Sequence, residues 1–139
     1  MFTADTDYVY FGSDGAIDGL YFNVSIPNDT VDAALTAEFW DGSNWTAFST
    51  LYDNCTDANS ASGQEIKFHH TGVITWEPET TWRKARLGVL SLGTPPYDLE
   101  GSESYVVDSH WQPKYWMRMN IDDVTTQASF KWIRRAPFI

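Results

Sequence analysis

The stretch that decides the fold spans residues 33–48 and reads AALTAEFWDGSNWTAF. In its first half, apolar side chains recur at every second position, at Leu35, Ala37 and Phe39. This alternation is typical of a strand with one buried face. The Asp41-Gly42 pair that follows favours a tight hairpin turn. The segment therefore predicts a β-hairpin, with residues 45–48 as the returning strand.

Similar alternation recurs on both sides of this hairpin. Further strands are expected over residues 8–11, 17–26, 65–68, 72–77, 115–121 and 130–133. Aromatic residues suit the pleated surface of a strand, and they make up 16% of the chain. Residues 80–84 fit one helical turn, whereas residues 52–63 show no periodicity and indicate a surface loop. We therefore expect an all-β protein, an antiparallel β-sandwich of jelly-roll type.

The domain organisation follows from length and composition. A chain of 139 residues fits one domain, which we expect to span residues 1–139. An arm at residues 1–7 and a tail at residues 134–139 are expected to be extended. Residues 87–113 carry glycines and prolines with little periodicity, and they predict a long loop insertion.

The charge balance restricts the classes of partner. Nine basic residues stand against 19 acidic ones, which gives a net charge of −10. Binding to a phosphate backbone needs clustered positive charge, so nucleic acid is not an expected partner. No apolar run approaches the ~20 residues of a membrane span, and no signal peptide is visible, so we expect no membrane partner. The single Cys55 rules out an internal disulfide.

Reactive groups do not form a recognisable catalytic motif. His69 and His70 are adjacent on an expected strand, so their side chains should point to opposite faces. Cys55 has no basic neighbour in the sequence that would lower its pKa. We expect no enzymatic activity and no cofactor. The alternative to having no cofactor is a bound calcium ion. Its best candidate ligands are the loop oxygens of Asp53, Asn54, Asp57 and Asn59, and the loop lacks the glycine of an EF-hand.

The tryptophans allow two interpretations. Trp45, Trp76 and Trp116 have apolar neighbours on expected strands, which favours core packing. An exposed ring is expected instead at Trp111, which together with Tyr97 or Tyr105 would form a platform for sugar rings. This platform is the sequence feature that a carbohydrate-binding module requires.

Several motifs occur in an order that resembles a known family. They are YFGSD at residues 10–14, FWDGSNWTAF at 39–48, TGVITWEP at 71–78, then Trp82, and YWMRM at 115–119. The succession resembles a β-sandwich domain of structural proteins in tailed bacteriophages, with its WDGSxW hairpin, SGxVxWxxPxxW segment and closing YWxR strand. Thr71 stands where serine is usual, and the segment between Trp82 and Tyr115 is longer than the pattern. The matching residues are architectural, so the resemblance transfers no catalytic residue.

The resemblance implies a non-enzymatic component of the virion, assembled in the host cytoplasm. A capsid decoration, or cement, protein that docks on the major capsid protein and other virion proteins is the first expectation. A tail or baseplate component and a carbohydrate-binding module for host-surface recognition are the alternatives. A homotrimer is the expected oligomer. The expected partner-contact residues are Tyr97, Tyr105, Trp111, Arg134, Arg135 and Phe138.

Overall fold

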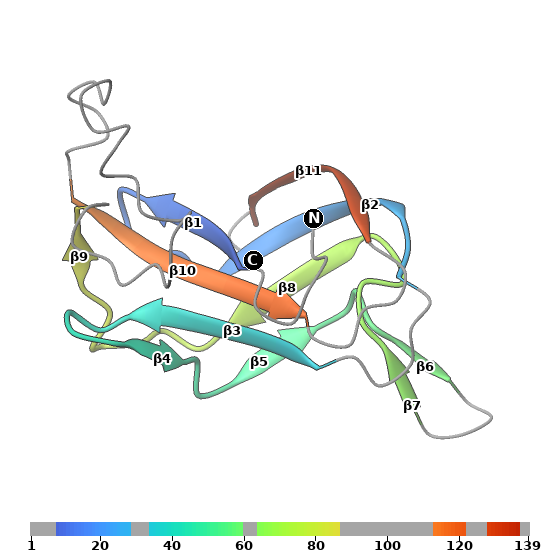
Figure 1. Ribbon diagram of the computed structural model, residues 1–139, viewed down its shortest axis with the longest axis horizontal. Coiled ribbons are helices and arrows are strands. Elements are labelled where there is room, and N and C mark those ends of the chain that lie inside the picture. Colours follow the sequence, from blue (N-terminus) through green and yellow to red (C-terminus); the bar gives the residue numbers. More distant parts are fainter. Residues whose placement is uncertain (1–7, 29–33, 60–63, 87–112, 122–127, 137–139) are drawn as a thin grey trace.

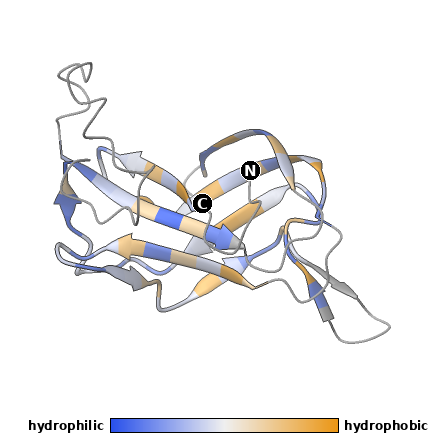
Figure 2. Cartoon of the chain, viewed as in Figure 1, coloured by the Kyte–Doolittle hydropathy of each residue, from blue (hydrophilic) through white to orange (hydrophobic). Residues whose placement is uncertain are grey.

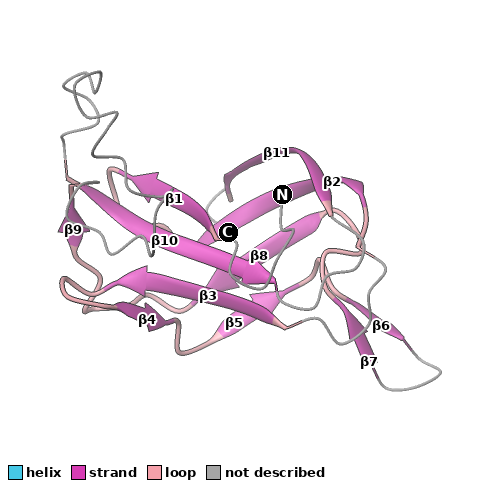
Figure 3. Cartoon of the chain, in the orientation of Figure 1, coloured by secondary structure: helices cyan, strands magenta, loops and turns pink. Residues whose placement is uncertain are grey.

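The computed structural model describes residues 8–28, 34–59, 64–86, 113–121 and 128–136. These residues form two layers of antiparallel strands packed as a β-sandwich (Figure 1). Figure 3 shows strands joined by turns throughout the described chain. Within these ranges, no helix is long and apolar enough to cross a membrane. The all-β sandwich expected from the sequence is therefore confirmed.

The first layer, sheet A, has the long strand β10 at its centre. Its strands, in spatial order, are β1 (Val9–Ser13), β10 (Lys114–Ile121), β3 (Leu35–Trp40) and β4 (Trp45–Ala47). The short β9 (Lys84–Ala85) also pairs with β10. Met117 of β10 is level with Phe11 on one side and with Phe39 on the other.

The second layer, sheet B, is bounded by the last strand of the chain. Its spatial order is β11 (Ser129–Arg135), β2 (Gly19–Ile26), β8 (Gly72–Trp76) and β5 (Leu51–Asp53). A separate hairpin joins β6 (Asp57–Asn59) to β7 (Gln64–Ile66). This connectivity leaves the jelly-roll part of the expectation unconfirmed.

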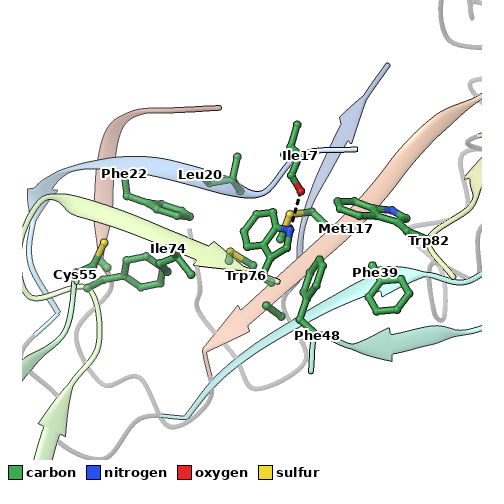
Figure 4. Packing of buried hydrophobic residues seen from close by; sticks show 14 residues of the cluster. Ile17, Leu20, Phe22, Phe39, Phe48, Cys55, Ile74, Trp76, Trp82 and Met117 are labelled. Atoms are coloured by element: carbon green, nitrogen blue, oxygen red, sulfur yellow. Dashed lines mark hydrogen bonds between the residues drawn. The ribbon is translucent and has the colours of Figure 1, made fainter. Parts of the chain in front are cut away.

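The core lies between the two sheets and is largely aromatic (Figure 4). Phe48, which follows β4, joins the layers, because its ring lies 4.8 Å from Trp76 of sheet B and 5.1 Å from Phe39 of sheet A, measured between centroids. The indole N–H of Trp76 donates to the carbonyl of Ile17 at 2.7 Å, so this polar atom is satisfied inside the core. The burial of Trp76 confirms the core packing that the sequence predicted for it. Figure 2 shows hydrophobic positions along the strands of both sheets.

A second aromatic cluster covers the outer face of sheet A. Trp40 and Ala85 are buried there, with Trp45 and Trp116 packed against them. Trp116 lies across Gly12 of the neighbouring strand and donates its indole N–H to the carbonyl of Ala85 at 2.9 Å. Core packing of Trp45 and Trp116 thus takes place outside the sandwich interior.

The Asp-Gly hairpin is confirmed in position and in chemistry. One carboxylate oxygen of Asp41 accepts the backbone N–H groups of Ser43 and Asn44, each at 2.8 Å. Gly42 has a φ of 108°, a conformation that favours glycine. The alternation of residues 35–40 is also confirmed, because Ala37 and Phe39 face the main core while Trp40 faces outward.

Four expectations about local structure prove wrong. Residues 52–63 are not simply a loop, because they contain most of β5 and all of β6. Residues 80–84 hold a turn at residues 80 and 81 and then lead into β9, which begins at Lys84, so they form no helical turn. His69 and His70 lie in the turn and bend after β7, not on a strand. The tail was expected to begin at residue 134, but β11 extends to residue 135. Ala136 is buried as well, and its N–H donates to the carbonyl of Gly19.

Candidate interaction surface

The candidate surface is built on β11, an edge strand that pairs with β2 alone among the described strands. The register between these two strands shifts between Phe130 and Trp132, so Lys131 is the extra residue of a β-bulge. Without the bulge, Phe130 and Trp132 would share one face of the strand. With it, Phe130 packs inward, whereas Trp132 is 39% exposed on the outer face of sheet B.

Trp132 forms a compact cluster with two neighbours, which we call the β11 patch: Tyr21, Trp132 and Arg134. The rings of Tyr21 and Trp132 stack with centroids 5.2 Å apart and an interplanar angle of 21°. The guanidinium carbon of Arg134 lies 4.4 Å from the centroid of Trp132 and 5.6 Å from that of Tyr21. The patch therefore combines the three side-chain types that dominate binding energy at protein interfaces.

Two exposed cations of β11 lack the ion pairs that some other cations of the described chain form. Lys67 pairs with Glu65, Lys114 with Asp14 and Arg118 with Glu38, whereas the cations at residues 83–86 form no ion pair among the described residues. Within the described residues, Lys131 and Arg134 form no such ion pair. Among the described residues, these two exposed cations of the edge strand thus have no acidic partner, in a protein with a net charge of −10.

A pocket of about 310 Å³ opens beside the patch, between β1 and β11. Its lining includes the apolar side chains of Phe11, Ile17, Leu20 and Ile133, together with Arg134 and Arg135. Arg135 is level with the buried Leu20, so it lies on the side of β11 that faces the gap between the sheets. The pocket thus lies between the edge of the apolar core and two arginines.

The expected contact residues are only partly described by the structure. Arg134 and Arg135 belong to an ordered strand, not to a tail, and both border the pocket. Tyr97, Tyr105, Trp111 and Phe138 lie outside the described residues, as do the arm at 1–7 and nearly all of the insertion at 87–113. The sequence analysis missed Trp132, although the run Lys131-Trp132-Ile133-Arg134 shows an aromatic residue among basic ones.

The reactive side chains are held in structural roles. Cys55 is fully buried in the main core, and burial, reinforced by the negative charge of Asp53, raises the pKa of its thiol to about 12. The Nδ1 atom of His69 lies 3.1 Å from the carbonyl oxygen of the buried Asn28. In the described part of the chain, no group of three or more His, Cys, Asp or Glu side chains is placed to hold a metal.

In the loop suggested for calcium, the side-chain oxygens of Asp53 and Asn54 accept hydrogen bonds from the protein itself. One carboxylate oxygen of Asp53 accepts the N–H of Cys55 at 2.7 Å, and the other accepts the hydroxyl of Thr56. The side-chain oxygen of Asn54 accepts the N–H of Val73 at 2.5 Å. These contacts tie the turn after β5 to β8. The side chains of residues 57 and 59 lie outside the description.

Fold and surface together define a β-sandwich protein with an aromatic–arginine patch on one edge strand. No family model, curated protein or solved structure matches the chain.

Proposed function

We propose that this protein is a non-enzymatic structural component of a tailed-bacteriophage virion, most specifically a capsid decoration protein. The observation that carries the proposal is the β11 patch, because the exposed Trp132 and Arg134 of an edge strand, packed against Tyr21 of β2, suit a docking surface. The partner would be the major capsid protein or another virion protein.

The motifs behind the family resemblance support this proposal, since they serve the scaffold. Trp76 and Trp82 are buried in the main core, and Asp41 organises the hairpin turn. Arg118 places its Nε atom 2.5 Å from a carboxylate oxygen of Glu38, and its guanidinium lies over the ring of Trp45 at 4.7 Å. A sandwich whose motif residues pack against one another or fix turns within the chain leaves its edges available for partners.

The copy number of the protein in particles tests the proposal. Virions of the phage that encodes this chain are purified on a density gradient and quantified by mass spectrometry against their major capsid protein. A decoration protein is expected at a copy number comparable with that of the capsid protein. Its absence from purified virions would overturn the proposal, and a copy number typical of tail proteins would move it to the tail or baseplate.

The proposed oligomer is a homotrimer, because sites around symmetry axes of a shell favour symmetric oligomers. Light scattering coupled to size exclusion should give three times the chain mass of 15.8 kDa. A mass equal to that of one chain at micromolar concentration would contradict the trimer without affecting the particle test.

The carbohydrate-binding alternative has less support among the described residues. The exposed ring of Trp132 already contacts Tyr21 and Arg134 of its own chain, so it does not offer a free flat platform. A glycan array run with and without calcium would detect such binding, and specific hits would favour this alternative over decoration.

A further inference from the structure

The stacking of Arg134 leaves its hydrogen-bond donors available. A guanidinium that lies over an aromatic ring uses its flat face, while its N–H groups point outward in its own plane. In Arg134 the guanidinium carbon lies 4.4 Å from the ring centroid of Trp132 and 5.6 Å from that of Tyr21. The two rings therefore hold the guanidinium in place and leave its planar fork of donors for a ligand, and such a fork matches a carboxylate.

The electrostatic setting adds selectivity for an acidic ligand. Arg134 makes no ion pair within the described residues, and Lys131 and Arg135 lie on the same strand. Acidic side chains outnumber basic ones by 19 to 9 in the whole chain, and β11 is one of two stretches in which basic residues gather, the other being residues 83–86. An acidic segment would be drawn to β11 and repelled by most of the remaining surface.

The neighbouring pocket supplies an apolar contact within reach of the same ligand. The partly buried Phe11 and Ile133 line it together with the buried Ile17 and Leu20, and Arg134 and Arg135 are part of its wall. A peptide with an acidic residue next to an apolar one can thus satisfy the arginine and fill the pocket. A simple anion would use only the first of these features.

We infer that the β11 patch binds a segment of a partner protein in which a carboxylate is received by Arg134 and an adjacent apolar side chain enters the pocket between β1 and β11. The inference rests on the proposed function for the identity of the partner as a virion protein. It specifies the chemistry of the partner at this site. The bulge at Lys131 makes the site, because it places Trp132 and Arg134 on the outer face of the sheet and not on the inner face with Phe130.

A fluorescein-labelled peptide of alternating glutamate and leucine tests the inference by fluorescence anisotropy. Arg134→Gln should weaken binding about tenfold or more, since it removes a charge-assisted pair of hydrogen bonds. The affinity of Arg134→Lys should lie between those of the wild type and Arg134→Gln, because lysine keeps the charge and loses the planar fork of donors. The matched control is Arg86→Gln, which changes the net charge equally at an exposed position after β9 in the other sheet.

NMR supplies a second readout that a merely structural role would not move. The indole N–H signal of Trp132 should shift as the peptide is added, and the wild-type dispersion of the spectrum should persist in Arg134→Gln. Equal weakening by the Arg134→Gln and Arg86→Gln substitutions would show bulk electrostatics and overturn the inference. Preferential binding of a labelled oligothymidine at Arg134 would also overturn it, in favour of phosphate.

The two proposals fail separately. If the Arg134→Gln protein occupied virions as fully as the wild type, acid recognition at β11 would be refuted while the virion assignment stood. If the protein were absent from virions and still bound the peptide through Arg134, the virion assignment would be refuted and the acid site would stand.

Discussion

Gly12 shows how a single missing side chain determines the outer face of sheet A. A Cβ atom at this position would lie 2.8 Å from a ring carbon of Trp116, well inside van der Waals contact. The ring cannot retreat freely, because its N–H is bonded to the carbonyl of Ala85. Glycine is thus required by a close approach across the strand pair.

We expect Gly12→Ala to destabilise the protein by about 1–3 kcal/mol, the usual cost of overpacking. Urea unfolding at neutral pH measures this difference. Gly15→Ala is the matched control, since a Cβ at Gly15 would meet nothing within 4 Å. Equal stability of the two variants would contradict the contact between Gly12 and Trp116.

Cys55 is the second residue whose chemistry is set by its surroundings. Its thiol is buried and its pKa is raised to about 12, first by burial and then by Asp53. The thiolate fraction at about pH 8 is then on the order of a thousandfold below that of an ordinary cysteine. Labelling by a disulfide reagent should be negligible in the folded protein and rapid in denaturant. Fast labelling under native conditions would contradict the burial of this side chain.

At the scale of elements, the hairpin between β3 and β4 carries a pH dependence of its own. The pKa of Asp41 is lowered below its usual 3.8, first by the backbone N–H groups of Asn44 and Ser43 and then by the hydroxyl of Thr46. A lowered pKa in the folded state contributes stability above about pH 3.8, and this contribution is lost as the pH falls through the lowered value.

Asp41→Asn should therefore destabilise the protein at neutral pH, and the deficit should shrink as the pH falls below 3.8. Urea midpoints of the variant and the wild type, measured across that range, provide the check. A deficit that stays constant down to acidic pH would show that the charge of Asp41 plays no part in the turn.

The sequence was sufficient to predict those elements in which the alternation of apolar residues and the turn residues indicate the same structure. In the β3–β4 hairpin, the Asp-Gly turn and the apolar positions indicated one structure, and that structure is present. It was insufficient for β5, because three residues are too few to show a period. Phe68 shows a further limit of prediction from sequence. It is buried at a φ of 52°, and its sequence neighbours do not indicate a left-handed backbone conformation.

The candidate surface was predictable only in part, for a reason specific to β11. Arg134 was a suggested contact residue, but two consecutive arginines suggested a tail instead of the end of a strand. Trp132 was missed because strict alternation would have placed it with Phe130. The bulge at Lys131 breaks that alternation, and a bulge depends on the partner strand, which the local sequence does not specify.

At the scale of the whole molecule, the two sheets are coupled through Phe48. Its ring contacts Phe39 of sheet A, Trp76 of sheet B and the buried Trp82. We expect Phe48→Ala to destabilise the protein by about 3–5 kcal/mol. Unfolding followed by tryptophan fluorescence and by far-ultraviolet circular dichroism should remain coincident, because one core serves both sheets.

Tyr52→Ala is the matched control for this truncation, since it removes a ring that is 56% exposed. Its expected effect is below about 1 kcal/mol. Similar losses in the two variants would mean that the ring of Phe48 does not join the sheets.

The central place of β10 in sheet A has a consequence for how the protein is made. Val9 of β1 is level with Met119, and Leu35 of β3 is level with Ile121, so both neighbours of β10 leave the ribosome long before it does. Because synthesis adds about 5–20 residues per second, roughly ten seconds pass between the synthesis of β1 and that of β10, its only described partner strand. Throughout that interval the nascent chain carries an unfinished sheet, whose unpaired strand edges are open to premature association.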